Sequence, residues 1–170
     1  MSWSRRALLA ALAAAPLCGC GFHPLYAGRT AGAYDPDLAA IKVAPIPDRA
    51  GQILALNLRE KLNPRGVDMP VRYTLNTTIT LARGDLGIER NATSVRGEID
   101  AVAIYNLTGP DGAALFHGRS HTVSAFNIEP DGYATQVAQD DASQRALYDV
   151  SDDMAMNLSL FMRNRRASSN

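Results

Sequence analysis

Cysteine is nearly absent from this sequence. Cys18 and Cys20 are the two cysteines among the 170 residues, and none occurs from Gly21 to Asn170. A structural zinc ion takes four ligands, and the chain has no second pair of cysteines to complete such a site. A disulfide within the region after Cys20 is excluded as well. That region must therefore be stabilised by its hydrophobic core.

The sequence also lacks an apolar run long enough to span a membrane, which takes about 20 residues. Its longest apolar run, Ala7–Leu17, is interrupted only by Pro16 and follows two basic residues, Arg5 and Arg6. A short apolar run behind positive charges is typical of a secretory signal peptide. The first residues of the chain are therefore predicted to direct export and to be removed.

The end of the apolar run, Leu17-Cys18-Gly19-Cys20, resembles the lipobox of bacterial lipoproteins. The resemblance implies that residues 1–19 are cleaved off between Gly19 and Cys20. Cys20 would then carry a diacylglyceryl thioether and an acyl chain on its new amino group. Acylation of Cys18 fits poorly because the bulky Leu17 would stand beside the scissile bond.

An excess of positive charge is missing too. Without Arg5 and Arg6 the chain has 15 basic and 17 acidic residues, a net charge of −2. No overall positive field therefore points to nucleic acid as a partner. Gly21 follows the anchor, whereas Asp at that position is the usual inner-membrane retention signal, so we expect the outer membrane. Residues 20–37 are predicted to form the lipidated N-terminus and a flexible tether, rich in Gly, Pro and Asp towards its end.

The remaining pattern predicts a single α+β domain over residues 38–166, followed by a disordered tail at 167–170. The expected order is strand, helix, three strands, helix, with two helices packed on one face of a four-stranded sheet. Asp48 is expected to cap the first helix. Turns are expected at Gly84–Gly87 and Gly109–Gly112. The expected strands are 39–46, 71–81, 88–107 and 114–128, and the helices are 49–62 and 133–163, the second of which could be one helix or two.

Catalytic and metal-binding patterns are not found. His117 and His121 lie on a predicted strand, where side chains four residues apart stand about 13 Å apart and cannot share one ion. The acidic pairs at 140–141 and 152–153 lack the alternating ligands and the glycine of a calcium loop. No nucleophile elbow, phosphate loop or dinucleotide fingerprint occurs. We therefore expect no enzymatic activity, no cofactor and no bound metal.

Basic residues on the predicted strands are the remaining candidates for a binding site. Lys42, Arg96 and Arg119 are such residues in a chain that is slightly acidic overall. One interpretation is that they are solvated charges that discourage pairing of strand edges. The other is that they bind the phosphates of an anionic, acylated ligand, because a guanidinium group matches phosphate in a bidentate manner.

Three stretches together resemble the lipopolysaccharide-assembly lipoprotein family, in its alphaproteobacterial branch. They are Cys20-Gly-Phe-His-Pro-Leu-Tyr26, the passage Ile46–Leu54 with Leu58 and Leu62, and the acidic final helix 138–161. The resemblance implies a fold of two helices on a four-stranded sheet. It also implies a lipoprotein that plugs and helps to assemble the lipopolysaccharide-transport β-barrel of the outer membrane and contacts lipopolysaccharide.

Only the lipidated Cys20 is carried over from the family residue by residue. Lys42, Arg96 and Arg119 remain candidates for lipopolysaccharide binding from their chemistry alone. Two other functions stay open: a lipoprotein that only scaffolds other envelope proteins, and a lipid-anchored hydrolase. The second would need a nucleophile and base that the sequence does not display.

Overall fold

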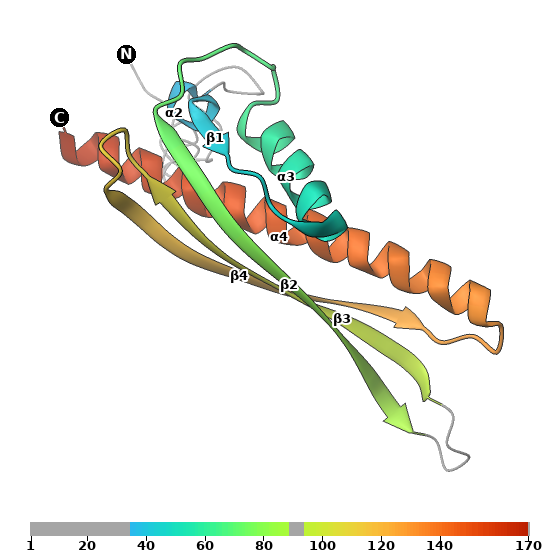
Figure 1. Ribbon diagram of the computed structural model, residues 1–170. Helices are drawn as coiled ribbons and strands as arrows, with labels where there is room; N and C mark the ends of the chain where they lie inside the picture. The colour runs from blue at the N-terminus through green and yellow to red at the C-terminus, as the bar shows by residue number, and fades with distance from the viewer. Residues whose placement is uncertain (1–34, 89–93, 170) are drawn as a thin grey trace, which may run out of the picture. The chain divides into compact units, whose positions relative to one another are not determined.

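The computed structural model describes residues 35–88 and 94–169, and the side chains of 35–85 and 96–168 (Figure 1). Cys18, Gly19 and Cys20 lie outside these residues, and so does most of the expected tether. Residues 34–170 form a compact unit. Its elements are α2 (Pro36–Ala39), β1 (Ile41–Val43), α3 (Asp48–Leu62), β2 (Tyr73–Ile88), β3 (Ser94–Thr108), β4 (Ala114–Asn127) and α4 (Gly132–Ser169).

The four strands form one sheet in the order β1-β2-β3-β4. The three-residue strand β1 runs parallel to β2, and the other neighbours are antiparallel. The expected hairpin between β3 and β4 is confirmed: the Gly109 amide donates to the Ala113 carbonyl at 2.9 Å. Gly112 has φ +77°, which a glycine adopts without steric cost. The α+β prediction of two helices packed against a four-stranded sheet is therefore confirmed.

The core lies between the sheet and the two long helices. In β3 every second residue from Gly97 to Leu107 is buried, as the alternation of the sequence predicts. α4 contacts β3 and β4, while α3 packs on α4 and touches β1 and β2. Figure 1 shows α4 passing behind β2, with α3 beside the middle part of α4. The helices contribute Leu54, Leu58, Leu62, Leu147, Val150, Met154 and Leu158 to this core.

Two glycines of the β3–β4 hairpin each lie beneath an aromatic ring on the neighbouring strand. Gly97 pairs with Phe126, and Gly118 pairs with Tyr105. A Cβ atom at either glycine would approach that ring to 2.4 Å. The Tyr105 hydroxyl accepts a hydrogen bond from the Asn157 amide at 3.3 Å, which fastens the hairpin to α4. The glycines therefore leave room for large side chains in the core.

The predicted turn at Gly84–Gly87 is wrong. These residues belong to β2, where Gly84 pairs with Glu98 and Asp85 pairs with Gly97. Pairing along a long neighbouring strand outweighs the local turn preference of the two glycines. β2 ends at Ile88 and β3 begins at Ser94, so the connection falls in residues 89–93, outside the described residues.

The N-terminal boundary of the domain also differs from the prediction. Asp35 and Pro36, expected in the tether, cap and begin the short helix α2, and β1 is shorter than the expected strand 39–46. Asp48 does not cap α3. It is the first residue of that helix, with φ +64°, and Pro47 precedes it without a side-chain cap.

The predicted end of the final helix and the predicted burial of two apolar residues also differ from the structure. α4 is continuous and extends to Ser169, so residues 167–169 prolong the helix into the expected tail. Val71 precedes β2 in a loop and is 60% exposed, although the alternation placed it on the buried face. Val137 is 50% exposed because it lies near the N-terminal end of α4, where the apolar stripe of the helix gives way.

Candidate functional site

All three candidate basic residues lie on the face of the sheet that the helices leave uncovered. The neighbours of Lys42 in β1, Ile41 and Val43, point into the core, so Lys42 points away from it. The same alternation places Arg96 and Arg119 on that face, and all three side chains are exposed. We call this surface the open face of the sheet.

The three residues are not brought together. Arg96 pairs with Asn127 near one end of the hairpin, and Arg119 pairs with Ile104, eight residues further along β3. Eight residues of strand span about 26 Å. Lys42 lies on the far side of β2, level with Thr74. No single phosphate can be held by two of these side chains, so the open face offers separate cationic points.

Arg119 has the most distinctive surroundings of the three. Ile104 lies directly opposite it and is 46% exposed, and Val123, four residues along β4, is 49% exposed. His117 and His121 flank Arg119 on the same strand and face. A cation beside exposed apolar side chains suits a ligand that carries both phosphate and acyl chains.

The two histidines each have a partner of their own. His117 Nδ1 contacts the side chain of Asn106, and His121 Nε2 lies 3.0 Å from an Asp100 carboxylate oxygen. These partners lie on the neighbouring strand β3. Among the described residues, no group of three His, Cys, Asp or Glu side chains is arranged to hold a metal ion.

Lys42, Arg96 and Arg119 differ in their interactions within the chain. Arg96 already interacts with other groups of the protein. For Lys42 and Arg119 no ion-pair partner is present within the described part of the chain. These two cations are therefore the more available for an external anion.

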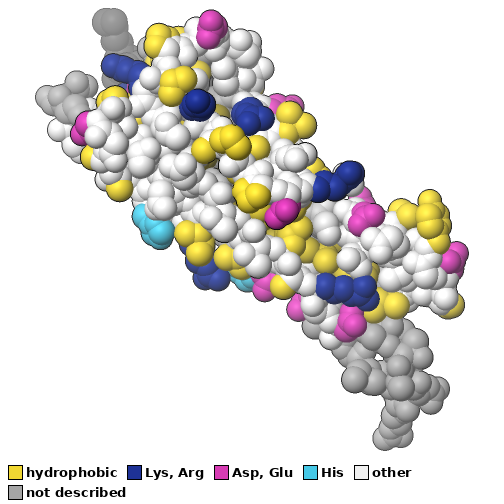
Figure 2. Space-filling view, in the orientation of Figure 1, with side chains coloured by type: hydrophobic (Ala, Val, Ile, Leu, Met, Phe, Trp, Pro, Cys, Tyr) yellow, Lys and Arg dark blue, Asp and Glu magenta, His cyan; other side chains and the backbone are white. Residues whose placement is uncertain are grey.

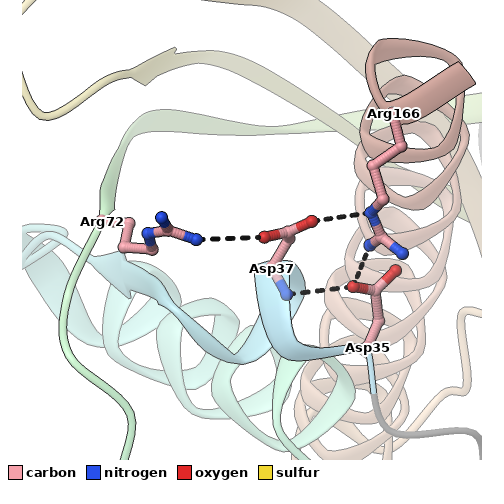
Figure 3. A network of polar contacts seen from close by, with 4 residues as sticks. All are labelled: Asp35, Asp37, Arg72 and Arg166. Atoms are coloured by element: carbon pink, nitrogen blue, oxygen red, sulfur yellow. Dashed lines mark hydrogen bonds and ion pairs between the residues drawn. The ribbon is translucent and has the colours of Figure 1, made fainter. Parts of the chain in front are cut away.

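A second cluster of charges, at the start of the domain, was not predicted from the sequence. Arg166 near the end of α4 makes hydrogen-bonded ion pairs with Asp35 and with Asp37, the latter at 2.7 Å (Figure 3). Arg72 lies 3.8 Å from the other oxygen of Asp37. The cluster ties the entry point of the chain to the end of α4 and the beginning of β2.

The electrostatics of Arg166 follow from this geometry. Partial burial by itself lowers the pKa of Arg166, but the hydrogen bonds and charges of Asp35 and Asp37 outweigh it and raise that pKa above its ordinary value. The partners are about 130 residues apart in sequence. The sequence places Arg166 at the end of the predicted domain and Asp35 in the predicted tether, so no local signal joins them.

The two long helices are joined by a similar polar contact. Lys61 of α3 reaches Asp152 of α4 at 2.5 Å, and its ammonium group lies 3.5 Å from the centre of the Tyr148 ring. The Lys61 side chain is only 15% exposed. This contact fixes α3 against the middle of α4.

The order and packing of these elements can now be compared with known folds. This is the fold of several bacterial lipoproteins. The described domain is similar to a candidate lipoprotein from Caulobacter crescentus, with a TM-score of 0.61 and 20% identity over 75% of this chain and 93% of that one. It is also similar to rare lipoprotein B from Shewanella oneidensis, with a TM-score of 0.58 and 11% identity over 74% and 96% of the two chains.

A third solved structure, a minor lipoprotein from Acinetobacter baumannii, gives a TM-score of 0.57 at 12% identity, over 72% of this chain and 92% of that one. The sequence matches no family model and no curated protein. At such low identities the likeness concerns the fold. In the described residues, no helix is both long and apolar enough to cross a bilayer.

Proposed function

We propose that this protein is an outer-membrane lipoprotein that plugs and helps to assemble the lipopolysaccharide-transport β-barrel. It would thereby assist the insertion of lipopolysaccharide into the outer leaflet. The observation that carries the proposal is the shared fold: two helices on a four-stranded sheet, as in solved bacterial lipoproteins, in a chain whose residues 17–20 resemble a lipobox. The role is one of binding and assembly and includes no catalytic step.

The open face of the sheet supports a direct contact with lipopolysaccharide. Arg119 stands opposite the exposed side chain of Ile104, Val123 is exposed about 13 Å further along β4, and Lys42 is exposed on the same face. A guanidinium group can bind a phosphate in a bidentate manner while the apolar side chains contact acyl chains. Arg96 adds a third cationic point at a distance that only a large ligand, or a second ligand molecule, could span.

Charge reversal on the open face tests the contact with lipopolysaccharide. In Arg96→Glu with Arg119→Glu, binding of purified lipopolysaccharide to the mature protein in detergent is expected to fall, because attraction to phosphate becomes repulsion. Binding by the unchanged protein should weaken as salt rises, since exposed charges are screened over about 8–10 Å at physiological ionic strength.

A matched control reverses two exposed arginines of α3, Arg49→Glu with Arg59→Glu, which changes the net charge equally but away from the open face. Its binding should stay close to that of the unchanged protein. Equal binding by all three proteins, with unaltered far-UV circular dichroism, would show that the open face is not the ligand-binding site.

The lipid anchor is tested separately. Cys20→Ala should block acylation and leave an unprocessed precursor, because the thiol that receives the diacylglyceryl group is lost. Cys18→Ala should leave processing intact. Normal palmitate labelling and a mature-size band from the Cys20→Ala variant would refute the anchor.

A further inference from the structure

The loop between α3 and β2, residues 63–72, exposes apolar and basic side chains side by side. Val67 is 39% exposed and Val71 is 60% exposed, and Arg65 and Arg72 lie beside them in sequence and are exposed. Figure 2 shows dark blue side chains beside yellow ones at the upper end of the molecule, the region of this loop in Figure 1. Single exposed valines are common, but two in one ten-residue loop with two arginines form a mixed patch.

The loop has a defined shape. The Asn63 side chain donates a hydrogen bond to the Val67 carbonyl at 2.9 Å and accepts one from the Val67 amide at 3.1 Å. Gly66 has φ +58°, which lets the chain turn tightly between these two residues. At the other end of the loop, the Arg72 amide donates to the Ala40 carbonyl at 3.0 Å. The exposed valine of the turn is thus held outward by the backbone.

The patch lies where the N-terminal segment enters the domain. Arg72 at the end of the loop and Arg166 in the last turns of α4 both contact Asp37, two residues after the first described residue (Figure 3). The loop, α2 and the end of α4 together carry five basic residues against three acidic ones: Arg65, Arg72, Arg163, Arg165 and Arg166 against Asp35, Asp37 and Asp68. Positive charge therefore gathers at this end of a chain whose charge is otherwise slightly negative.

The length of chain before this point limits how far the patch can lie from a membrane. Asp35 lies fifteen positions after Cys20, and fifteen chain steps span at most about 50 Å when fully extended. Acyl chains on Cys20 would therefore keep this end of the domain within about 50 Å of the leaflet that holds them. Exposed apolar side chains flanked by cations are suited to the boundary between lipid headgroups and acyl chains.

We propose that the loop 63–72 and the C-terminal turns of α4 form a membrane-facing patch that binds anionic phospholipid headgroups in the leaflet that holds the Cys20 anchor. The valines enter the interface, and Arg65, Arg72 and Arg163 meet the phosphates. In vesicles without the barrel, the patch orients the domain so that its opposite end points away from the membrane. This inference rests on the proposed lipid anchor and adds a second, orienting contact to it.

The test uses the mature, acylated protein in vesicles and exploits the absence of any cysteine after Cys20. When Cys20 is a thioether, Val71→Cys provides the one free thiol of the mature chain, and so does Gln136→Cys at the opposite end of α4 as a matched control. Each thiol is labelled with a fluorophore that nitroxide-labelled lipids quench. Vesicles contain either phosphatidylcholine alone or phosphatidylcholine with phosphatidylglycerol.

The label at position 71 should be quenched strongly in vesicles that contain phosphatidylglycerol, and the label at position 136 weakly. Each replacement of Arg65 or Arg163 by Gln should lower the equilibrium constant for headgroup binding about fivefold. The quenching at position 71 should decrease as a result. Raising the salt concentration should act in the same direction. Far-UV circular dichroism checks that each variant is folded.

Two different failures can be told apart. Flotation with vesicles of phosphatidylcholine alone reports on the anchor, because these vesicles carry no net charge for the patch to meet. Protein that floats but shows equal quenching at positions 71 and 136 would overturn the patch and leave the anchor. Protein that does not float would overturn both. Arginine variants that lose lipopolysaccharide binding but keep their quenching would assign these arginines to lipopolysaccharide and overturn the patch.

Discussion

The two ends of the domain are built and charged differently. At the end where the chain enters, α2, α3, α4 and β1 meet around the ion pairs of Arg166, and basic residues outnumber acidic ones. At the opposite end only α4 and the three long strands remain, and Figure 1 shows the ends of β2 and β3 extending beyond the helices. There the acidic residues Asp85, Glu98, Asp100, Glu129, Asp131, Asp140 and Asp141 outnumber the basic residues Arg83, Arg96 and Arg145.

This difference shows that a net charge near zero can conceal a polarised molecule. The overall charge did not point to a nucleic-acid partner, and it gave no indication of two ends with opposite sign. A basic end beside a lipid anchor and an acidic end away from it would orient the domain at an anionic surface. The open face, which carries the candidate lipopolysaccharide contacts, connects the two ends.

The largest effect is expected from the core of the entry end. Leu75 of β2 is fully buried beside β1, whereas Leu81, six residues further along the same strand, is only partly buried. Leu75→Ala should lower the free energy of unfolding by about 2–5 kcal/mol, from lost burial and the remaining cavity. Leu81→Ala should cost clearly less. Chemical denaturation measures both, and equal losses would contradict a core that thins towards the acidic end.

The glycine–aromatic pairs should give the next largest effect. Gly118→Ala forces a Cβ against Tyr105, which is fully buried, and should cost about 1–3 kcal/mol through overpacking. Gly97→Ala meets Phe126, which is 5% exposed and lacks the hydroxyl that bonds Tyr105 to α4, so its cost should be smaller. Gly132→Ala is the control, because nothing lies within 4 Å of a Cβ there. A loss of thermal stability in Gly132→Ala as large as in the other two variants would refute this packing.

The smallest effect on stability is expected from the ion pairs at the entry end. Arg166→Gln removes the partner of Asp35 and Asp37, but its side chain is 42% exposed, so the loss should be about 1 kcal/mol or less. The raised pKa of Arg166 means that its contribution is present below the ordinary arginine pKa and is lost only as the pH rises through the raised value. Stability measured around neutral pH should therefore show no titration of Arg166.

Arg163→Gln, one turn earlier on α4, serves as the control for Arg166→Gln. Hydrogen exchange should report the difference more clearly than global unfolding, because only α2 and the start of β2 depend on this cluster. Unchanged exchange of the Asp37 and Arg72 amides in Arg166→Gln would show that the cluster does not hold the entry segment.

The sequence predicted the fold well where apolar residues alternate over a long stretch. The faces of β2, β3 and β4 and the positions of both long helices follow from periods of two and of 3.6 residues, because one side of each element is buried. It failed at Gly84–Gly87, where strand pairing decides the conformation, and at Asp48, where a positive φ replaces the expected cap. Such features depend on neighbours distant in sequence.

The candidate site was predicted less completely. That Lys42, Arg96 and Arg119 share one exposed face follows from their strand positions, but their separation requires the register of the strands. The cluster of Arg166, Asp35 and Asp37 requires that the first and the last segments of the domain's chain meet, which no local pattern specifies. The loop 63–72 contains ordinary turn residues. A function for its arginines is suggested only by the position of the loop beside the segment where the chain enters the domain.

Purification of the tagged protein from detergent-solubilised outer membrane, followed by mass spectrometry, tests whether this lipoprotein plugs the transport barrel. We expect that a β-barrel of the lipopolysaccharide-transport type co-purifies in a near-equimolar amount and that the N-terminal peptide begins with acylated Cys20. The barrel should remain with the protein in Arg96→Glu with Arg119→Glu, because these residues are proposed to contact the ligand. Recovery of the acylated protein with other envelope proteins but without any such barrel would refute the proposed role.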